Sequence, residues 1–294
     1  MKVAQFTEAQ GINLSVLMPV YNAELTIRDA VQSTLKSMPE NSELLIQLDG
    51  CVDDSRTVIE TIFDDRIRIF ESKENLGIAA TLNSLLSQAR GTYIARMDQD
   101  DICLPRRFKK QLNAMRILNS DLLFGKAVLW NPKKLFSFFP VPSPRFSREE
   151  LDLALIRSNP LVHPTMMATK SCLEALGGYR QSVAEDYELW LRARTHGFQI
   201  DRLNSYLILY RVHDKQLTKR LEWQQKLNQD QNLIESLAAF SQKVLGLRPR
   251  ERVSLSETSD ALWKELVTIF KPNVFLRWKL LGLKATLQSL RRKD

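Results

Sequence analysis

Short apolar runs alternate with amphipathic segments over the first 130 residues of the chain. The runs at Leu14–Val20 and 44–48 are apolar at almost every position, which is typical of strands buried on both faces. Between them, apolar residues recur every three or four positions, as in helices packed on one side. Further strands are expected at 67–70 and 92–97. This alternation predicts an α/β protein with a Rossmann-like, mainly parallel sheet and helices on both faces.

Polar residues follow the predicted strands at the points where a parallel sheet would bring them together. The segments concerned are residues 19–22, 49–50, 75–77 and 98–101. Open α/β sheets bind ligands beyond the carboxyl ends of their strands. We therefore expect all four segments to line one crevice.

The last of these segments, Asp98-Gln99-Asp100-Asp101, is the most informative. Three neighbouring carboxylates repel one another and lose solvation, which a folded protein tolerates mainly when a cation sits beside them. Ligands that are all oxygen suit Mg²⁺ or Mn²⁺, and these ions usually carry phosphate oxygens as well. The alternative is a solvated acidic turn, but the neighbouring strand-end segments favour a metal site.

The pattern changes after residue 130. Residues 131–146 contain several Pro and Phe residues and are expected to form a loop or flap. A helix is expected to start at Glu185 and Asp186, and His163 is expected to pack inside the protein. From residue 219 onwards the pattern is helical, with breaks at prolines. We predict one domain over residues 1–218 and a C-terminal helical region over 219–294.

Composition limits the class of protein further. With 294 residues, 44% of them hydrophobic and 26% charged, the chain can bury a full core and is not expected to be disordered. Its three cysteines are scattered without metal-binding spacing, and no leader or membrane-spanning stretch is evident, so a cytoplasmic location is expected. The absence of a glycine-rich phosphate loop argues against P-loop ATPases and ordinary dinucleotide enzymes.

The net charge of +8 predicts an anionic partner. Nucleic acid is not expected, because no helix-turn-helix, zinc spacing or aromatic-basic sheet signature is present. Residues 271–294 mix basic residues with leucines and Trp278, which fits an amphipathic helix packed on the domain or one bound to an anionic membrane surface. The tryptophan among the bases favours the membrane, and hence a peripheral location on its inner face.

Six short motifs occur in one order along the chain. They are the segments 15–24, 49–50, 75–77, 98–101, 185–186 and 210–213. Each motif alone is weak, but together, over about residues 12–218, they resemble glycosyltransferase family 2 of the bacterial surface-polysaccharide type. The resemblance implies the inverting GT-A fold, a nucleotide-sugar donor, and Mn²⁺ or Mg²⁺ as cofactor.

The resemblance also implies roles for the matched positions. The nucleotide-sugar site would comprise Pro19, Tyr21, Glu24, Asp49, Asn75 and Asp98. The metal ligands would be Asp98, Asp100 and His213, and the catalytic base would be Asp186. Shaping a turn is the alternative role for Asn75, and a surface position is the alternative for His213.

One departure from the family pattern affects the expected donor. Leu48-Asp49-Gly50-Cys51 stands where the family usually has Asp-Asp-Gly-Ser, so one carboxylate and one hydroxyl that bear on the choice of base are lost. UDP remains the expected nucleotide, with dTDP and GDP as alternatives. The predicted reaction is metal-dependent sugar transfer to a hydroxyl group of a glycan or a lipid-linked oligosaccharide. A sugar nucleotidyltransferase and a non-catalytic nucleotide-sugar-binding protein are the competing hypotheses.

Overall fold

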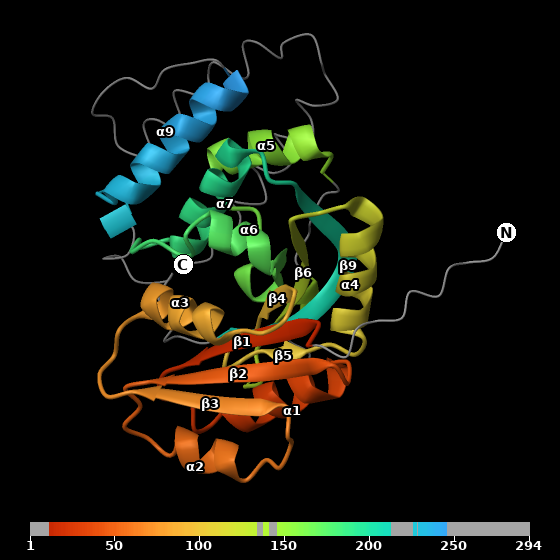
Figure 1. Ribbon diagram of the computed structural model, residues 1–294, viewed down its shortest axis with the longest axis vertical. Helices are drawn as coiled ribbons and strands as arrows, with labels where there is room; N and C mark the ends of the chain where they lie inside the picture. The colour runs from red at the N-terminus through yellow and green to blue at the C-terminus, as the bar shows by residue number, and fades with distance from the viewer. Residues whose placement is uncertain (1–11, 134–137, 141–145, 213–225, 228, 246–294) are drawn as a thin grey trace, which may run out of the picture.

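The strands form one mainly parallel sheet at the centre of the molecule (Figure 1). The computed structural model describes residues 12–133, 138–140, 146–212, 226–227 and 229–245. In this part of the chain the strand order is β3-β2-β1-β4-β8-β6-β9-β5, with β7 paired to β6. The strands are β1 (Leu14–Val20), β2 (Ser42–Asp49), β3 (Ile67–Ser72), β4 (Tyr93–Arg96), β5 (Ile102–Cys103), β6 (Leu122–Trp130), β7 (Phe138–Pro140), β8 (Met167–Thr169) and β9 (Ile200–Arg211).

The first four strands run parallel to one another, as the sequence predicts. Strand β8 is antiparallel to both of its neighbours, β4 and β6, whereas β6 and β9 are parallel. Strand β7 lies in the region that the sequence predicts to be a loop or flap. Its three residues pair with the end of β6 and form an antiparallel ribbon with it. The α/β class and the mainly parallel sheet are therefore confirmed.

Helices cover both faces of the sheet. They are α1 (Ile27–Ser37), α2 (Ser55–Glu60), α3 (Ile78–Gln88), α4 (Arg107–Leu118), α5 (Arg148–Arg157), the short 3₁₀ helix η1 (His163–Thr165), α6 (Lys170–Ala175), α7 (Glu185–His196) and α9 (Gln231–Leu245). Helices α1, α2 and α4 pack on one face, and α3, α5, α6, α7 and α9 pack on the other. Strand residues alternate between the two cores: Val16 and Met18 belong to the first, and Leu17 to the second.

A buried carboxylate joins the strands at the end of the sheet opposite the carboxyl ends of β1 and β2. Glu43 accepts hydrogen bonds from the Ser15 hydroxyl and the Arg90 backbone N–H, each at 2.7 Å, and from Arg68 Nη1 at 2.7 Å. Burial alone would raise the pKa of Glu43, but these hydrogen bonds lower it overall. Ser15 in turn accepts the Gly91 N–H. This polar cluster holds β1, β2 and β4 in register.

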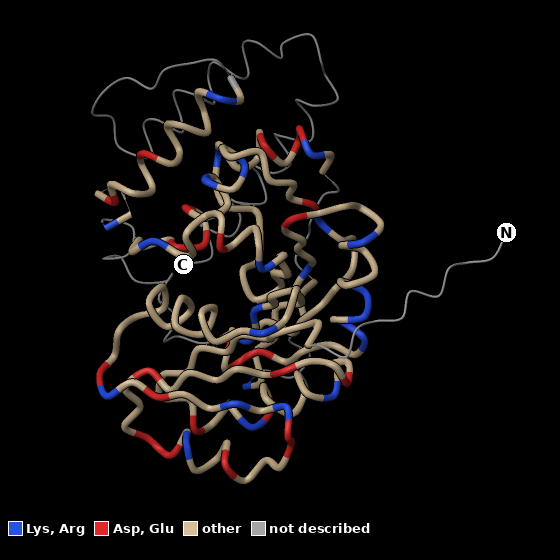
Figure 2. The backbone as a smooth tube through the Cα atoms, viewed as in Figure 1, with Lys and Arg blue, Asp and Glu red and all other residues tan. Residues whose placement is uncertain are grey.

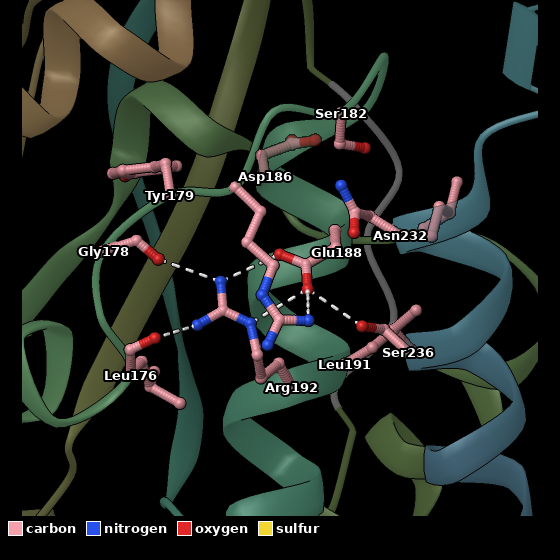
Figure 3. A network of polar contacts seen from close by, with 12 residues as sticks. Leu176, Gly178, Tyr179, Ser182, Asp186, Glu188, Leu191, Arg192, Asn232 and Ser236 are labelled. Carbon is pink, nitrogen blue, oxygen red and sulfur yellow. Dashed lines mark hydrogen bonds and ion pairs between the residues drawn. The ribbon is translucent and has the colours of Figure 1, made fainter.

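Helix α9 lies within the predicted C-terminal region and packs against α7 and α5 (Figure 1). Its Leu233, Leu237 and Phe240 are buried in the core that α7 also lines. A second link is polar: Ser236 Oγ donates to Glu188 Oε1 at 2.8 Å (Figure 3). The boundary at residue 218 stays a prediction. Helix α9, which follows it, contributes to the same hydrophobic core as the residues before it.

Two predictions concern segments outside the described residues. His213, the third expected metal ligand, and residues 271–294, the expected membrane-binding segment, are both in this group. Within the described ranges, no helix combines the length and the apolar character that a bilayer crossing requires.

Candidate active site

The carboxyl ends of β1, β2, β3 and β4 meet at one edge of the sheet, because these four strands are parallel neighbours. The loops that follow them contain the predicted site residues. Two hydrogen bonds join the first and last of these loops: Tyr21 N–H donates to Gln99 Oε1 at 2.6 Å, and Gln99 Nε2 donates to Tyr21 O at 3.2 Å. The loop after β1 is therefore held directly against the acidic loop after β4.

The predicted nucleoside-binding residues lie on two connected loops. Pro19 is the second-last residue of β1. The Tyr21 side chain, just beyond the strand, is about half exposed and thus available for a ligand. Glu24 Oε2 accepts the Asp54 N–H at 3.2 Å, so this carboxylate helps to hold the loop before α2.

Asp49 and Asn75 hold the loop between β3 and α3. Asp49 is buried and accepts hydrogen bonds from the backbone N–H groups of Leu76 at 2.9 Å and Gly77 at 3.0 Å. Asn75 Oδ1 accepts the same Gly77 N–H. Gly50 has a φ of 66°, and a Cβ there would lie 2.6 Å from the Asn75 nitrogen, so glycine is required where these two loops touch. Base recognition by Asp49 stays a prediction.

Three carboxylates converge after β4. One oxygen from each of Asp98, Asp100 and Asp101 lies within 4.8 Å of the other two. Asp101 is buried, and its Oδ2 has no hydrogen-bond donor among the described residues. Burial, followed by the charges of the other two carboxylates, raises the pKa of Asp101 well above its ordinary value. A buried oxygen without a donor beside two like charges fits a divalent cation site, and it adds Asp101 to the predicted ligands Asp98 and Asp100.

Arg211, at the end of β9, supports this acidic loop. Its backbone N–H donates to Asp101 Oδ1 at 2.9 Å, and its Nε donates to the Asp100 carbonyl at 2.6 Å. Its guanidinium group lies 4.5 Å from the centre of the Trp130 ring. The end of β9 and the end of β6 therefore fix the position of the carboxylates.

Asp186 lies in the first turn of α7, as predicted. Its Oδ2 accepts a hydrogen bond from Asn159 Nδ2 at 2.9 Å, and 20% of its side chain is exposed. Burial raises the pKa of Asp186, although the Tyr187 N–H and the Arg96 charge oppose this effect. Burial and then the Asp186 charge raise the pKa of neighbouring Glu185 to about 8. The two neighbouring carboxylates thus each make it harder to ionise the other.

Arg96 connects the two acidic groups. Its Nη2 lies 2.9 Å from Asp98 Oδ1, and its side chain is 9% exposed. Burial alone would lower the pKa of Arg96, but the charges of Asp98, Glu185 and Asp186 raise it. The charge of Asp186 also raises the pKa of Asp98. Arg96 is therefore paired with Asp98 and is also subject to the charges of Glu185 and Asp186.

Sequence reasoning missed Asn159 and Tyr179 near Asp186, whereas for His163 it weighs lining the acceptor site against packing and favours packing. His163 is buried, as expected, but its Nδ1 lies 3.7 Å from Glu185 Oε1 and 4.0 Å from Asp186 Oδ2. Its Nε2 lies 2.9 Å from the Tyr179 hydroxyl. Asn159 gave no distinctive signal, although the dipeptide it forms with Pro160 marks a turn that can present a side chain.

Comparisons with known proteins identify the family. The model of Glycosyl transferase family 2 matches residues 15–175, more than half of the chain. EpsE of Bacillus subtilis, whose name assigns it provisionally to the glycosyltransferases, is 32% identical over 212 residues, covering 69% of this chain and 74% of EpsE. The amylovoran biosynthesis glycosyltransferase AmsE of Erwinia amylovora is 29% identical over 217 residues, covering 71% of this chain and 80% of AmsE.

Solved structures show the same fold. TarS of S. aureus, in complex with UDP-GlcNAc, matches with a TM-score of 0.64 and 18% identity over 88% of this chain and 73% of TarS. The mannosyltransferase PcManGT of Pyrobaculum calidifontis, in complex with GDP-Man and Mn²⁺, matches with a TM-score of 0.57 and 16% identity over 96% of this chain and 76% of PcManGT. The predicted GT-A fold is thereby confirmed. The chain belongs to glycosyltransferase family 2 and is an enzyme that transfers sugars.

Proposed function

We propose that this enzyme transfers a sugar from a UDP-sugar to a hydroxyl group of a glycan or a lipid-linked oligosaccharide, with inversion at C1 and with Mn²⁺ or Mg²⁺. One observation carries the proposal: Arg96, which is paired with Asp98 at 2.9 Å, is also within reach of the charges of Glu185 and Asp186. A metal-bound diphosphate and a base on opposite sides of the sugar are what a single displacement at C1 requires. The assembly of a bacterial surface polysaccharide is the proposed setting, in line with the name of AmsE.

In the proposed reaction, the acceptor oxygen forms a bond to C1 while the bond from C1 to the diphosphate oxygen breaks. The hydroxyl proton passes to Asp186. A raised pKa makes this carboxylate a stronger base, and its partial exposure lets a hydroxyl reach it. A bound divalent ion would offset the negative charge that develops on the leaving diphosphate. The raised pKa of neighbouring Glu185 disfavours two negative charges on this pair.

The first experiment tests donor binding. UDP-GlcNAc, UDP-glucose, dTDP-glucose and GDP-mannose are added one at a time, with and without Mn²⁺, and the melting temperature is measured. A true donor raises stability by mass action, about 2.7 kcal/mol at 100 times its Kd. We expect the rise to need Mn²⁺ and to disappear in Asp100→Asn.

The second experiment tests the base. Asp186→Asn should keep the donor-dependent rise in melting temperature and lose roughly two to four orders of magnitude in turnover. Asp65→Asn is the matched control, because Asp65 is exposed and precedes β3 at the opposite edge of the sheet. Near-normal turnover in Asp186→Asn would exclude its role. Pyrophosphate release from a sugar phosphate and a nucleoside triphosphate would favour a nucleotidyltransferase instead.

A further inference from the structure

The segment between α5 and η1 holds one side of Asp186. Asn159 Nδ2 donates to Asp186 Oδ2 at 2.9 Å. Asn159 Oδ1 accepts the Leu161 backbone N–H at 3.1 Å, so the amide is fixed with its nitrogen toward the carboxylate. Because Asp186 Oδ1 accepts the Tyr187 N–H, each of its two oxygens already has a protein donor. The carboxylate therefore has a defined orientation before any substrate binds.

His163 reaches the same carboxylate from further along this segment. Its imidazole is buried between two rings, with centroids 5.3 Å from Trp190, edge to face, and 5.5 Å from Tyr179. Nε2 lies 2.9 Å from the Tyr179 hydroxyl, and Nδ1 faces Glu185 and Asp186. The packing leaves the ring one orientation, with one nitrogen toward each group.

The proposed arrangement of protons on this pair follows from its acceptors. A proton on Nδ1 can be donated to the ionised Asp186 carboxylate, which only accepts hydrogen bonds, and Nε2 then accepts from the Tyr179 hydroxyl. The other acceptor of this hydroxyl is Met166 Sδ at 3.7 Å, which is a weaker one. Burial, followed by the Arg96 charge, lowers the pKa of His163 well below its ordinary value, and burial raises that of Tyr179. The other ionisable groups near the pair are Asp98 and Glu185. A neutral imidazole and an un-ionised phenol agree with this arrangement.

We propose that Asn159, His163 and Tyr179 are positioning residues for Asp186. Asn159 and His163 present two N–H groups to the carboxylate, and Tyr179 fixes the tautomer of the imidazole. The 4.0 Å between His163 Nδ1 and Asp186 Oδ2 shortens to a hydrogen bond when substrate is bound, since catalytic hydrogen bonds are often long without ligand. This inference rests on the proposed role of Asp186 as the base.

The tautomer can be measured without donor or acceptor. The chain has three histidines, so a two-bond ¹H–¹⁵N spectrum of ¹⁵N-histidine-labelled protein is readily assigned with His163→Asn. We expect His163 to stay neutral, with the proton on Nδ1, from about pH 5.5 to pH 8. A proton on Nε2, or a titration near the ordinary histidine value, would overturn the arrangement.

Kinetics test the consequence, with UDP-GlcNAc and Mn²⁺ as the probe and release of UDP as the signal. His163→Leu should lose about 10- to 100-fold in kcat, whereas His163→Asn, whose amide nitrogen takes the place of Nδ1, should recover most of it. Tyr179→Phe should lose about 3- to 10-fold. The donor KM should change less than about twofold, because the affected group acts on the acceptor.

The pH profile separates positioning from a merely structural role. Donation to the ionised carboxylate lowers the pKa of Asp186, so its loss in His163→Leu should move the acid limb of the kcat profile to higher pH. Ser236→Ala is the control: it loses a buried hydrogen bond to α7 and should lose stability without moving this limb. Equal losses in His163→Leu and His163→Asn, or an unmoved acid limb, would refute the proposal. If wild type turns over no nucleotide sugar, the proposed function fails, while the spectrum still decides the tautomer.

Discussion

Replacing Arg192 by methionine tests the polar cluster that joins α7 to its surroundings (Figure 3). Glu188 is fully buried, and Arg192 Nε and Nη2 each donate to its carboxylate at 2.9 Å. The same guanidinium donates to the carbonyls of Leu176 and Gly178, just before Tyr179. Arg192, on α7, thus links this helix to the loop after α6 (Figure 3).

The size of the effect follows from these contacts. Arg192→Met would leave the Glu188 carboxylate in the core with the Ser236 hydroxyl and a longer, 3.5 Å contact to Arg180. Removing one partner of a buried ion pair costs about 3–5 kcal/mol, because the remaining charge is desolvated without compensation. The double variant Glu188→Leu/Arg192→Met removes both charges and should cost less than Arg192→Met alone.

Urea denaturation of wild type, both single variants and the double variant would measure these free energies of unfolding as a double-mutant cycle. We expect a coupling energy of about 1–3 kcal/mol between the two residues. A cost below about 1 kcal/mol for Arg192→Met, or a double variant equal to the sum of the singles, would refute the reasoning.

Three further predictions follow from other contacts. Glu43→Gln should cost about 1–3 kcal/mol of unfolding free energy at neutral pH. Since folding lowers the pKa of Glu43, the difference in unfolding free energy from wild type should shrink as pH falls below about 4. Urea denaturation at several pH values would measure this difference. Gly178→Ala should cost at least 1 kcal/mol in thermal unfolding, because φ is 71° and a Cβ would lie 2.3 Å from Asn83 Oδ1; a smaller loss would mean that Asn83 moves aside. Without metal, Asp101→Asn should have a melting temperature at least as high as that of wild type, because it removes one of three crowded negative charges. Mn²⁺ should then raise the melting temperature of Asp101→Asn less than that of wild type. Equal increases would exclude Asp101 as a ligand.

The part of the site that the sequence predicts best is the part built from strand ends. Hydrophobic patterning places β1 to β4, and parallel pairing then brings Tyr21, Asp49 and Asp98 to one edge without further information. The helix that carries Asp186 is similarly local, since it follows from residues 184–192 alone. The family resemblance adds the family itself, which the comparisons confirm.

The surroundings of Asp186 could not be predicted in the same way. Asn159 and Tyr179 approach it from loops, and His163 from the three-residue 3₁₀ helix η1, none of which has a recognisable periodic pattern in the sequence. Their positions depend on packing against Trp190 and on hydrogen bonds that join residues 16 or more positions apart in sequence. The hydrogen bond from Arg211 to Asp101 could not be predicted for the same reason, since the two residues are 110 positions apart in sequence.

That last contact has a consequence for synthesis of the protein. A nascent chain that has emerged only as far as α4 already contains the acidic loop and the first four strands, but it lacks the β9 backbone that pairs with β5 and donates to Asp101. The acidic loop can therefore reach its final geometry only after Arg211, at the end of β9, has left the ribosome.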